Sequence, residues 1–221
     1  NDIYDSTSTL AHESGHALQS VYTDKAQPFW YSQYPIFIAE IASTLNESLL
    51  NHYMLEKYAD DPKIKAFILT QDVDNFIGTV YRQTLFAEFE HFIYTEDAKG
   101  TTLTPDLMAD KFNGLFKEYN GDAVSDLPWK DDTWAQIPHF YYDYYVYQYA
   151  TSKAIATALA DDIISGKPGA LENYKKFLSA GASDYPVEIV KKAGVDVTKR
   201  DYLDHAFKLF GEEVEELKQI L

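Results

Sequence analysis

Two histidines and a glutamate near the start of the chain have the spacing of a metal site. Residues 9–17 read Thr-Leu-Ala-His-Glu-Ser-Gly-His-Ala and contain the pattern H-E-x-x-H, formed by His12, Glu13 and His16. On a helix, residues four apart share one face, so both imidazoles point the same way. At about 100° per residue, Glu13 lies roughly 60° around the helix from His16, beside a metal without binding it. Two neutral imidazoles suit zinc, and the carboxylate can take a proton from zinc-bound water.

The same pattern also arises by chance on surface helices, where both histidines are simply solvated. A metal centre therefore needs a third ligand elsewhere in the chain. Because the sequence has no cysteine, that ligand must be His, Asp or Glu, and a disulfide framework is impossible.

The third ligand that we predict is Glu40. Pro35 is well placed to begin a helix over about 36–58, whose apolar residues recur at helical spacing. Those residues are Ile38, Ile41, Leu45 and Leu49. Glu40 lies 24 residues after His16, which fits one helix, a loop and a return along an antiparallel neighbour. A carboxylate supplied in this way completes a His₂Glu site and leaves the fourth position open for water.

Two further side chains of this helix are candidates to support the ligands. Glu47 lies seven residues after Glu40 on nearly the same line, and Ser43 lies between them. Either one is a candidate to hydrogen-bond a ligand imidazole. The alternative is that both glutamates are solvated acids on the outer face of an amphipathic helix.

Hydrophobic periodicity and turn residues predict helices along the whole chain, with no convincing strand. The expected helices cover about 6–22, 36–58, 62–97, 104–119, 137–164, 169–180, 186–194 and 198–220. In the first of them the candidate buried positions are Leu10, Ala17, Leu18 and Val21. There is no internal repeat, so one all-α domain is the economical fold.

A second segment with candidate functional side chains runs through residues 137–150. Six tyrosines lie within nine of its residues, from Tyr141 to Tyr149, and open the helix expected over 137–164. Most of them are expected to pack in the interior. A zinc peptidase also needs donors aimed at the oxyanion of its tetrahedral intermediate. His139, with one or two of the tyrosines, is the natural source.

Other clusters of titratable residues are interpreted as structural. Glu88 and His91 form E-x-x-H, which is half of the pattern of a di-iron bundle, and no second copy exists. His91 and His205 are therefore expected to be ordinary packed or surface histidines. The acidic run near the end of the chain predicts a solvated helix face; it comprises Glu212, Glu213, Glu215 and Glu216.

Composition and charge exclude several classes of partner. Of the 221 residues, 46% are hydrophobic, which is typical of a globular protein, and the formal net charge is −16. This charge argues against nucleic acids and anionic membrane surfaces as partners. No apolar run reaches the length of a membrane span, and the start of the chain does not read as a signal peptide. Because the chain begins at Asn1 without Met, we expect a fragment or a processed piece. Separately, we expect a cytoplasmic location.

With these segments in hand, the sequence resembles the M3 family of zinc metallopeptidases, most closely its oligoendopeptidase F branch. The resemblance covers nearly the whole chain and rests on residues 9–16, 39–47, 81–90 and 139–151, with 181–196 also similar. It implies that one zinc ion is bound by His12, His16 and Glu40, and that Glu13 is the general base. Ser14 departs from the family, whose members usually carry a larger apolar residue there.

The resemblance also implies roles for the tyrosine-rich segment. His139 and Tyr147, with Tyr144, would bind substrate carbonyls and the oxyanion. Relatives hydrolyse short peptides inside a channel between helical halves. The implied fold is an all-α, gluzincin-like single multi-helix domain with the zinc site between two antiparallel helices. Since family members are much longer, residues 1–221 resemble their C-terminal zinc-binding part, roughly the final third.

The activity expected from these residues is zinc-dependent hydrolysis of internal bonds in short oligopeptides. Zinc would lower the pKa of its water and polarise the scissile carbonyl, while Glu13 would move the proton to the leaving amine. A zinc carboxypeptidase of related helical fold is an alternative with the same chemistry. A fragment or helical module without catalysis is an alternative of a different class, and a di-iron oxidase is a distant third.

Overall fold

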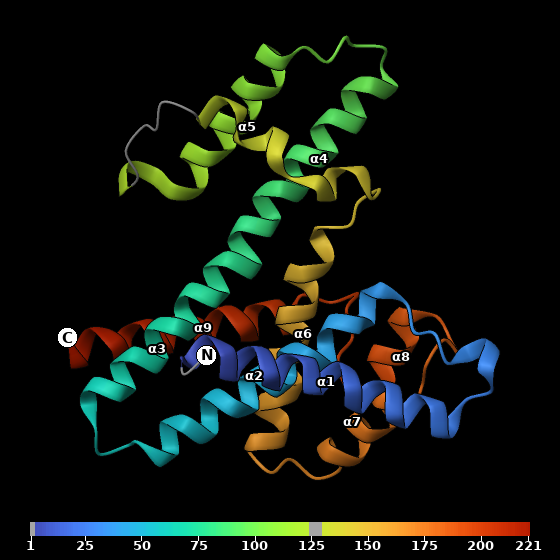
Figure 1. The fold of residues 1–221 in the computed structure, drawn as a ribbon, viewed down its shortest axis with the longest axis vertical. Helices are drawn as coiled ribbons and strands as arrows, with labels where there is room; N and C mark the ends of the chain where they lie inside the picture. The colour runs from blue at the N-terminus through green and yellow to red at the C-terminus, as the bar shows by residue number, and fades with distance from the viewer. Residues whose placement is uncertain (1–2, 124–129) are drawn as a thin grey trace. The chain divides into compact units, whose positions relative to one another are not determined.

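The computed structural model describes residues 3–123 and 130–221 (Figure 1). All regular elements in these ranges are helical, which confirms the predicted all-α class. No helix among the described residues is long and apolar enough to cross a membrane. The chain divides into two compact units. The first unit comprises Asn1–Phe76 with Thr151–Leu221, and the second comprises Ile77–Ala150.

The first unit has a hydrophobic core centred on two helices. Its elements are α1 (Tyr4–Ala26), α2 (Ile36–Lys57), α3 (Pro62–Phe76), most of α6 (Tyr147–Ile164), α7 (Ala170–Leu178), α8 (Pro186–Ala193) and α9 (Asp201–Ile220). The predicted apolar stripe of α2 is confirmed, because Ile38, Ile41 and Leu45 are fully buried and Leu49 is partly buried. They cluster with apolar residues of α6, α7 and α8, including Ile155 and Phe177.

The helices α1 and α2 form an antiparallel pair. Side-chain hydrogen bonds join Tyr4 to Asn51, His12 to Glu47, and Ser20 to Tyr34, which lies just before α2. As the position on α1 increases, the position of the partner decreases, so the two segments are antiparallel. The short connection from Gln27 to Pro35, which includes a 3₁₀ turn at Phe29–Tyr31, returns the chain along α1. The antiparallel arrangement expected from the spacing of the candidate ligands is therefore present.

The two helices touch backbone to backbone at Gly15. A Cβ atom at this position would lie 2.5 Å from the carbonyl oxygen of Ala42 and 2.6 Å from the Cα of Ser43. Such distances are shorter than any side chain tolerates, so Gly15 is the residue that permits this approach. The sequence pattern alone did not reveal this contact.

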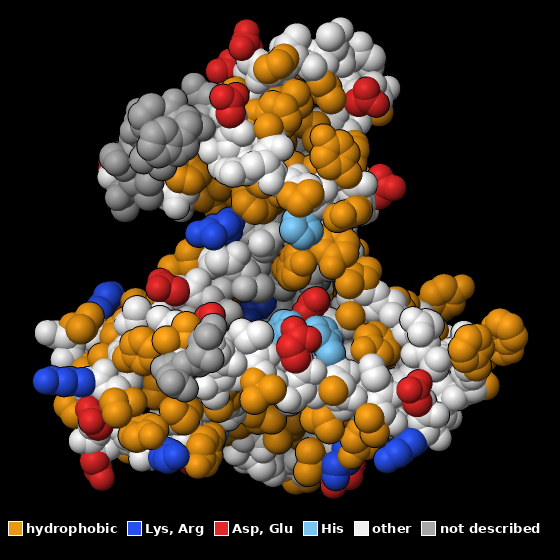
Figure 2. Space-filling view, viewed as in Figure 1, with side chains coloured by type: hydrophobic (Ala, Val, Ile, Leu, Met, Phe, Trp, Pro, Cys, Tyr) orange, Lys and Arg blue, Asp and Glu red, His pale blue; other side chains and the backbone are white. Residues whose placement is uncertain are grey.

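The buried face of α1 differs from the predicted one. Leu10, Leu18 and Val21 are 67%, 43% and 47% exposed, and Ala17 is exposed as well. The helix instead buries Gly15, Gln19 and Thr23. The hydroxyl of Thr23 donates to the carbonyl of Leu178 on α7, at 2.7 Å. Close backbone approach and hydrogen bonding favour small and polar residues at this contact, so hydrophobic spacing indicated the wrong face. Figure 2 shows hydrophobic side chains, in orange, on the surface of the first unit.

The helix expected over 62–97 is interrupted. Asp61 caps α3, since its Oδ1 accepts from the backbone N–H groups of Lys63 and Ile64. One π-helical turn (Ile77–Tyr81) then separates α3 from α4 (Arg82–Ala98). The division between the two units falls at this turn.

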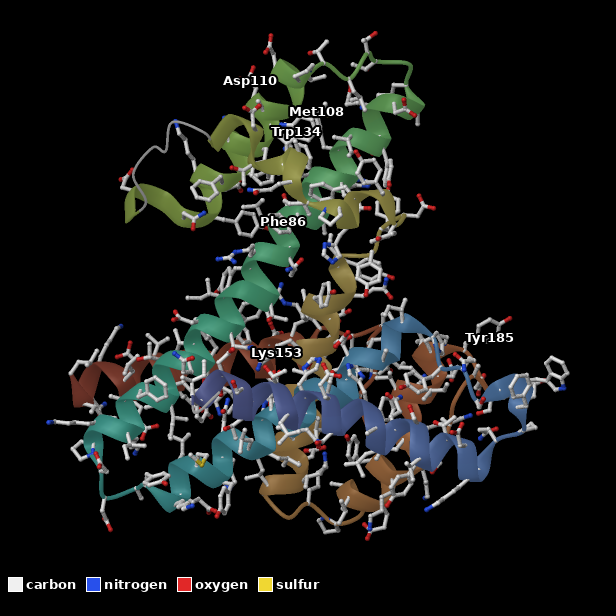
Figure 3. All side chains as sticks on the ribbon, viewed as in Figure 1. Phe86, Met108, Asp110, Trp134, Lys153 and Tyr185 are labelled. Carbon is white, nitrogen blue, oxygen red and sulfur yellow. The ribbon has the colours of Figure 1, made fainter. Side chains whose placement is uncertain are left out.

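The second unit has an aromatic core. It contains α4, α5 (Pro105–Asn120) and several 3₁₀ turns. The buried residues of this hydrophobic cluster are Leu85 and Phe89 of α4, Phe112 and Leu115 of α5, and Phe140. Phe86, Met108 and Trp134, which are labelled in Figure 3, pack against them while staying partly exposed. The ring of Phe89 lies edge-on to Phe112, with centroids 5.2 Å apart.

The tyrosine-rich segment does not begin a helix at 137. A 3₁₀ turn covers Pro138–Tyr141, and α6 begins only at Tyr147. Between them, Asp143 and Tyr144 have positive φ angles of 47° and 58°. Most of the tyrosines are also outside the core, contrary to expectation. The exposed ones are Tyr141, Tyr142, Tyr144 and Tyr147, at 85%, 60%, 41% and 40%. We call residues 140–147 the tyrosine segment.

The acidic end of the chain is only partly a solvated face. α9 begins at Asp201, three residues later than predicted. Glu213 is half-buried and lines a cavity of about 300 Å³ together with Lys153 and Asp72. Burial and the nearby Asp72 carboxylate raise the pKa of Glu213 to about 8.

Substitution of Gly15 tests the close contact between α1 and α2. Gly15→Ala should lower the free energy of unfolding by about 1–3 kcal/mol, because the methyl group forces the helices apart. Gly211→Ala in α9 is the control, since a Cβ there meets nothing within 4 Å. That change should be neutral or stabilising by up to about 1 kcal/mol. Urea denaturation measures both; equal stability of the two variants would contradict the contact.

Candidate metal site

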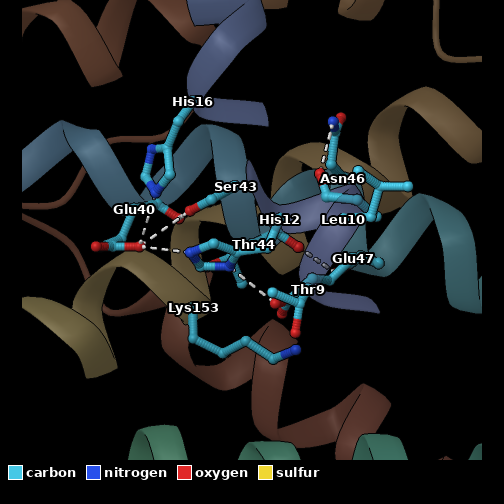
Figure 4. Close-up of polar contacts among 12 residues, drawn as sticks. Thr9, Leu10, His12, His16, Glu40, Ser43, Thr44, Asn46, Glu47 and Lys153 are labelled. Atoms are coloured by element: carbon cyan, nitrogen blue, oxygen red, sulfur yellow. Dashed lines mark hydrogen bonds and ion pairs between the residues drawn. The ribbon is translucent and has the colours of Figure 1, made fainter. Parts of the chain in front are cut away.

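Three ligand atoms from α1 and α2 converge in the first unit. The Nε2 atoms of His12 and His16 lie 3.4 Å and 3.6 Å from Oε2 of Glu40 (Figure 4). The three side chains are each about a fifth to a quarter exposed, which gives an ion access from solvent. Among the residues that the structure describes, they form the only group of three or more His, Asp or Glu side chains close enough to hold a metal.

The spacing of these atoms fits a zinc ion. Bonds of about 2.1 Å in a tetrahedral arrangement place ligand atoms about 3.4 Å apart. The two separations from the Glu40 oxygen, 3.4 Å and 3.6 Å, match that requirement, and all three atoms lie within 4.8 Å of one another. Two imidazoles and one carboxylate are also the donor set of hydrolytic zinc sites with one open position. The residues present therefore fit the metal.

A second carboxylate orients His12. Oε1 of Glu47 lies 2.8 Å from Nδ1 of His12, and an ionised carboxylate can only accept, so Nδ1 donates the proton. This tautomer leaves the lone pair of Nε2 directed at the Glu40 oxygen and free for a metal. The predicted contact between Glu47 and an imidazole is therefore present.

Ser43 acts on the carboxylate ligand rather than on an imidazole. Its hydroxyl is fully buried and lies 3.0 Å from Oε2 of Glu40 and 3.0 Å from the Glu40 carbonyl oxygen. It can donate to either oxygen, and the first contact holds the carboxylate in the direction of the two histidines. Ser43 also lies at the close contact with Gly15. The approach of the α1 and α2 backbones at this point therefore sets the distance between the histidines of α1 and Glu40 of α2.

The hydrogen bond with Glu47 changes the titration of His12. It raises the pKa of His12 above the usual 6.5, and burial opposes it. The charges of Glu47, Glu40 and Glu13 act in the same direction as the hydrogen bond. No Lys or Arg forms an ion pair with these carboxylates among the described residues, so the site attracts cations.

Glu13 lies beside the three ligands on α1 and is exposed. No hydrogen bond or ion pair within the described part of the chain holds its carboxylate. The carboxylate of Glu13 is therefore accessible to solvent.

The other predicted site residues belong to the second unit. The ring of His139 lies among tyrosines, with centroid distances of 5.6 Å to Tyr145 and 6.1 Å to Tyr142. Tyr144 contacts His91, whose Nδ1 lies 3.4 Å from the tyrosine hydroxyl. Tyr147 is the first residue of α6 and is 40% exposed. Because the segment before Tyr147 is not helical, Tyr144 and Tyr147 do not lie on one helix face.

Within the described part of the chain, Glu88 and His91 do not belong to a group of side chains that could hold a metal. Glu88 accepts a hydrogen bond from the hydroxyl of Tyr119, while His91 contacts Tyr144. His205 is paired with Asp161, at 3.0 Å. Each histidine therefore has a side-chain partner, and a purely structural role for both stays a prediction.

The profile of peptidase family M3 matches residues 3–209. The chain belongs to peptidase family M3. This M3 chain is 46% identical to the group B oligopeptidase PepB of Streptococcus agalactiae over 220 residues and 47% identical to the oligopeptidase PepF of Bacillus subtilis over 214. It is covered completely by the first match and to 96% by the second.

Solved structures agree with this assignment. The M3 chain superposes on the oligoendopeptidase F of Enterococcus faecium with a TM-score of 0.87 and 47% identity, over 98% of its own length and 39% of that protein's. A peptidase of Chlamydophila abortus gives a TM-score of 0.88 at 40% identity. The chain spans only about a third of the curated relatives, 36% of PepB and 32% of PepF.

Replacing Glu47 tests how His12 is oriented. In the metal-free M3 chain, Glu47→Gln should lower the pKa of His12, since the charge of Glu47 is removed and its hydrogen bond, the main cause of the upward shift, becomes weaker. NMR titration of the imidazoles measures this, with His205 as the internal control. Because the folded pKa of His12 is raised, its protonation stabilises the fold below pH 6.5, and that contribution disappears as pH rises through the folded pKa.

The same variant should bind zinc roughly 10- to 100-fold more weakly than the parent, because the uncharged amide oxygen of Gln is a weaker acceptor for the Nδ1–H group and fixes the ligand ring less well. An unchanged His12 pKa together with unchanged zinc affinity would show that Glu47 does not orient this ligand.

Proposed function

We propose that the protein is a zinc-dependent endopeptidase that hydrolyses internal bonds of short oligopeptides. The observation that carries the proposal is the convergence of His12, His16 and Glu40 beside an exposed Glu13, in a chain of peptidase family M3. The names of similar proteins support the substrate class, since they are oligopeptidases and oligoendopeptidases.

We assign one zinc ion to His12 Nε2, His16 Nε2 and Glu40 Oε2. When bound, zinc supplies Lewis-acid polarisation of the scissile carbonyl and acidifies water. The two imidazoles bind in their neutral form, with Glu47 keeping the proton of His12 on Nδ1. Ser43 keeps the Glu40 carboxylate turned toward them.

Glu13 is the proposed general base. Its exposed carboxylate accepts a proton from the attacking water and then delivers it to the nitrogen of the departing amine. Glu13 is the only carboxylate within residues 9–17.

In the second unit, we propose that His139, Tyr147 and Tyr144 bind peptide carbonyls and the developing oxyanion. Their family resemblance supports this role, and so does the exposure of Tyr144 and Tyr147, at 41% and 40%, which makes these side chains accessible to a ligand. Residues 1–221 would then be the zinc-binding part of an oligopeptidase catalytic domain. A cytoplasmic location stays a prediction, which cell fractionation tests.

The roles of Glu13 and Glu40 can be separated by measuring zinc and turnover together. The intact chain should bind about one zinc ion. Glu40→Ala should lose it, whereas Glu13→Gln should keep zinc and lose peptide hydrolysis by at least about 100-fold. Zinc analysis and cleavage of an internally quenched peptide measure both. Undiminished hydrolysis by Glu13→Gln would overturn its assignment.

Tyr147→Phe should lower kcat without releasing zinc, because it removes a donor to the oxyanion and no metal ligand. A loss of roughly 10-fold or more is expected for one such donor. Mass spectrometry of the products should show internal cleavage. Stepwise release of single C-terminal residues would instead support the carboxypeptidase alternative, and loss of zinc would make Tyr147 structural.

A further inference from the structure

The tyrosine segment contains a conformation that its own residues do not favour. Asp143 and Tyr144 are consecutive non-glycine residues in the left-handed region, with φ angles of 47° and 58°. Asp adopts this region fairly often, but for a bulky residue such as Tyr it is an outlier. Such a conformation persists only where surrounding contacts determine it.

Those contacts come from one face of α4. The backbone N–H of Tyr144 donates to Oε1 of Glu90, at 2.6 Å. One turn further along α4, the hydroxyl of Tyr94 donates to the carbonyl of Phe140, at 2.8 Å. The rings of Tyr94 and Tyr144 also pack, with centroids 5.0 Å apart. Tyr94 therefore holds the tyrosine segment at its first residue, Phe140. Glu90 holds the left-handed turn itself, through the backbone N–H of Tyr144.

Glu90 is an unusual residue at its position. It is 0% exposed, and its second oxygen, Oε2, has no hydrogen-bond partner among the described residues. Burial raises the pKa of Glu90, and the bond from the Tyr144 N–H opposes that shift. A buried carboxylate with one unsatisfied oxygen is usually less stabilising than an apolar side chain of similar size. Glu90 is therefore not explained by stability of the core.

We propose that Glu90 is a positioning residue that holds the left-handed turn at Asp143–Tyr144. It thereby fixes how the tyrosine segment presents Tyr144 and Tyr147 to a peptide. The consequence for peptide binding rests on the proposed function, whereas the hydrogen bond and the turn do not.

Hydrogen exchange of the Tyr144 amide tests the contact directly. In the 1–221 chain, Glu90→Leu should accelerate exchange of this amide by roughly 10-fold or more, because it loses a charge-assisted hydrogen bond. Glu90→Gln keeps an acceptor oxygen and should give an intermediate rate. Glu88→Leu, an exposed position on the same helix that contacts Tyr119 instead, should leave the rate within about two-fold. Unchanged exchange in Glu90→Leu would overturn the proposal, as would an equal effect of Glu88→Leu.

Rescue by glycine separates positioning from a merely structural role. Glycine adopts positive φ freely, so Asp143→Gly should restore the turn in the Glu90→Leu background without restoring protection of the Tyr144 amide. Peptide cleavage by the zinc-loaded chain should fall about 10-fold in kcat/KM in Glu90→Leu and recover in the double variant, with zinc content constant throughout. The thermal midpoint of Glu90→Leu should not fall. A lower midpoint without glycine rescue would assign Glu90 to core stability and overturn the proposal.

The exchange and activity experiments test separate claims, so either one can be contradicted without the other. If no variant, including the parent, cleaves peptides, the proposed function is contradicted, while exchange of the Tyr144 amide still decides whether Glu90 holds the turn. If the parent cleaves peptides and Glu90→Leu loses amide protection without loss of kcat/KM, the turn is held by Glu90 but does not position the tyrosines. That result would overturn the positioning role.

Discussion

The close contact of two backbones at Gly15 is the constraint on which the candidate metal site depends. Zinc ligands must lie within a few ångströms of each other, and the ligands here come from two different helices. Helices that carry ordinary side chains at their contact lie 8–10 Å apart, typically, so a ligand group that spans them needs either long side chains or a closer approach. Gly15 supplies the closer approach, and Ser43 at the same point turns Glu40 toward the histidines.

The same close contact explains why α1 buries small and polar side chains and exposes large apolar ones. Its contact face consists of Gly15, Gln19 and Thr23, while its leucines face solvent. A tight helix contact excludes large side chains, and Thr23 adds a hydrogen bond to α7. Glu47 belongs to the same arrangement, because only a close antiparallel partner brings its carboxylate within 2.8 Å of His12.

The sequence predicted the elements whose physical basis is local. The stripe of α2 follows from hydrophobic spacing, and the convergence of His12, His16 and Glu40 follows from helical periodicity and the length of the connection. The buried face of α1 was not predictable in this way. Hydrophobic periodicity identifies the face that carries large apolar residues, whereas this contact requires small ones. The start of α6 was also misplaced, because left-handed residues such as Tyr144 are fixed by a contact with Glu90, 54 positions away in sequence. Long-range contacts of this kind leave no local pattern.

The most direct test of this account is the position of zinc in crystals of the zinc-loaded chain, located by anomalous diffraction at the zinc absorption edge. The account predicts one peak within about 2.0–2.2 Å of His12 Nε2, His16 Nε2 and Glu40 Oε2, with no fourth protein ligand. A peak held by a different set of side chains, or a fourth protein ligand that closes the coordination sphere, would contradict it.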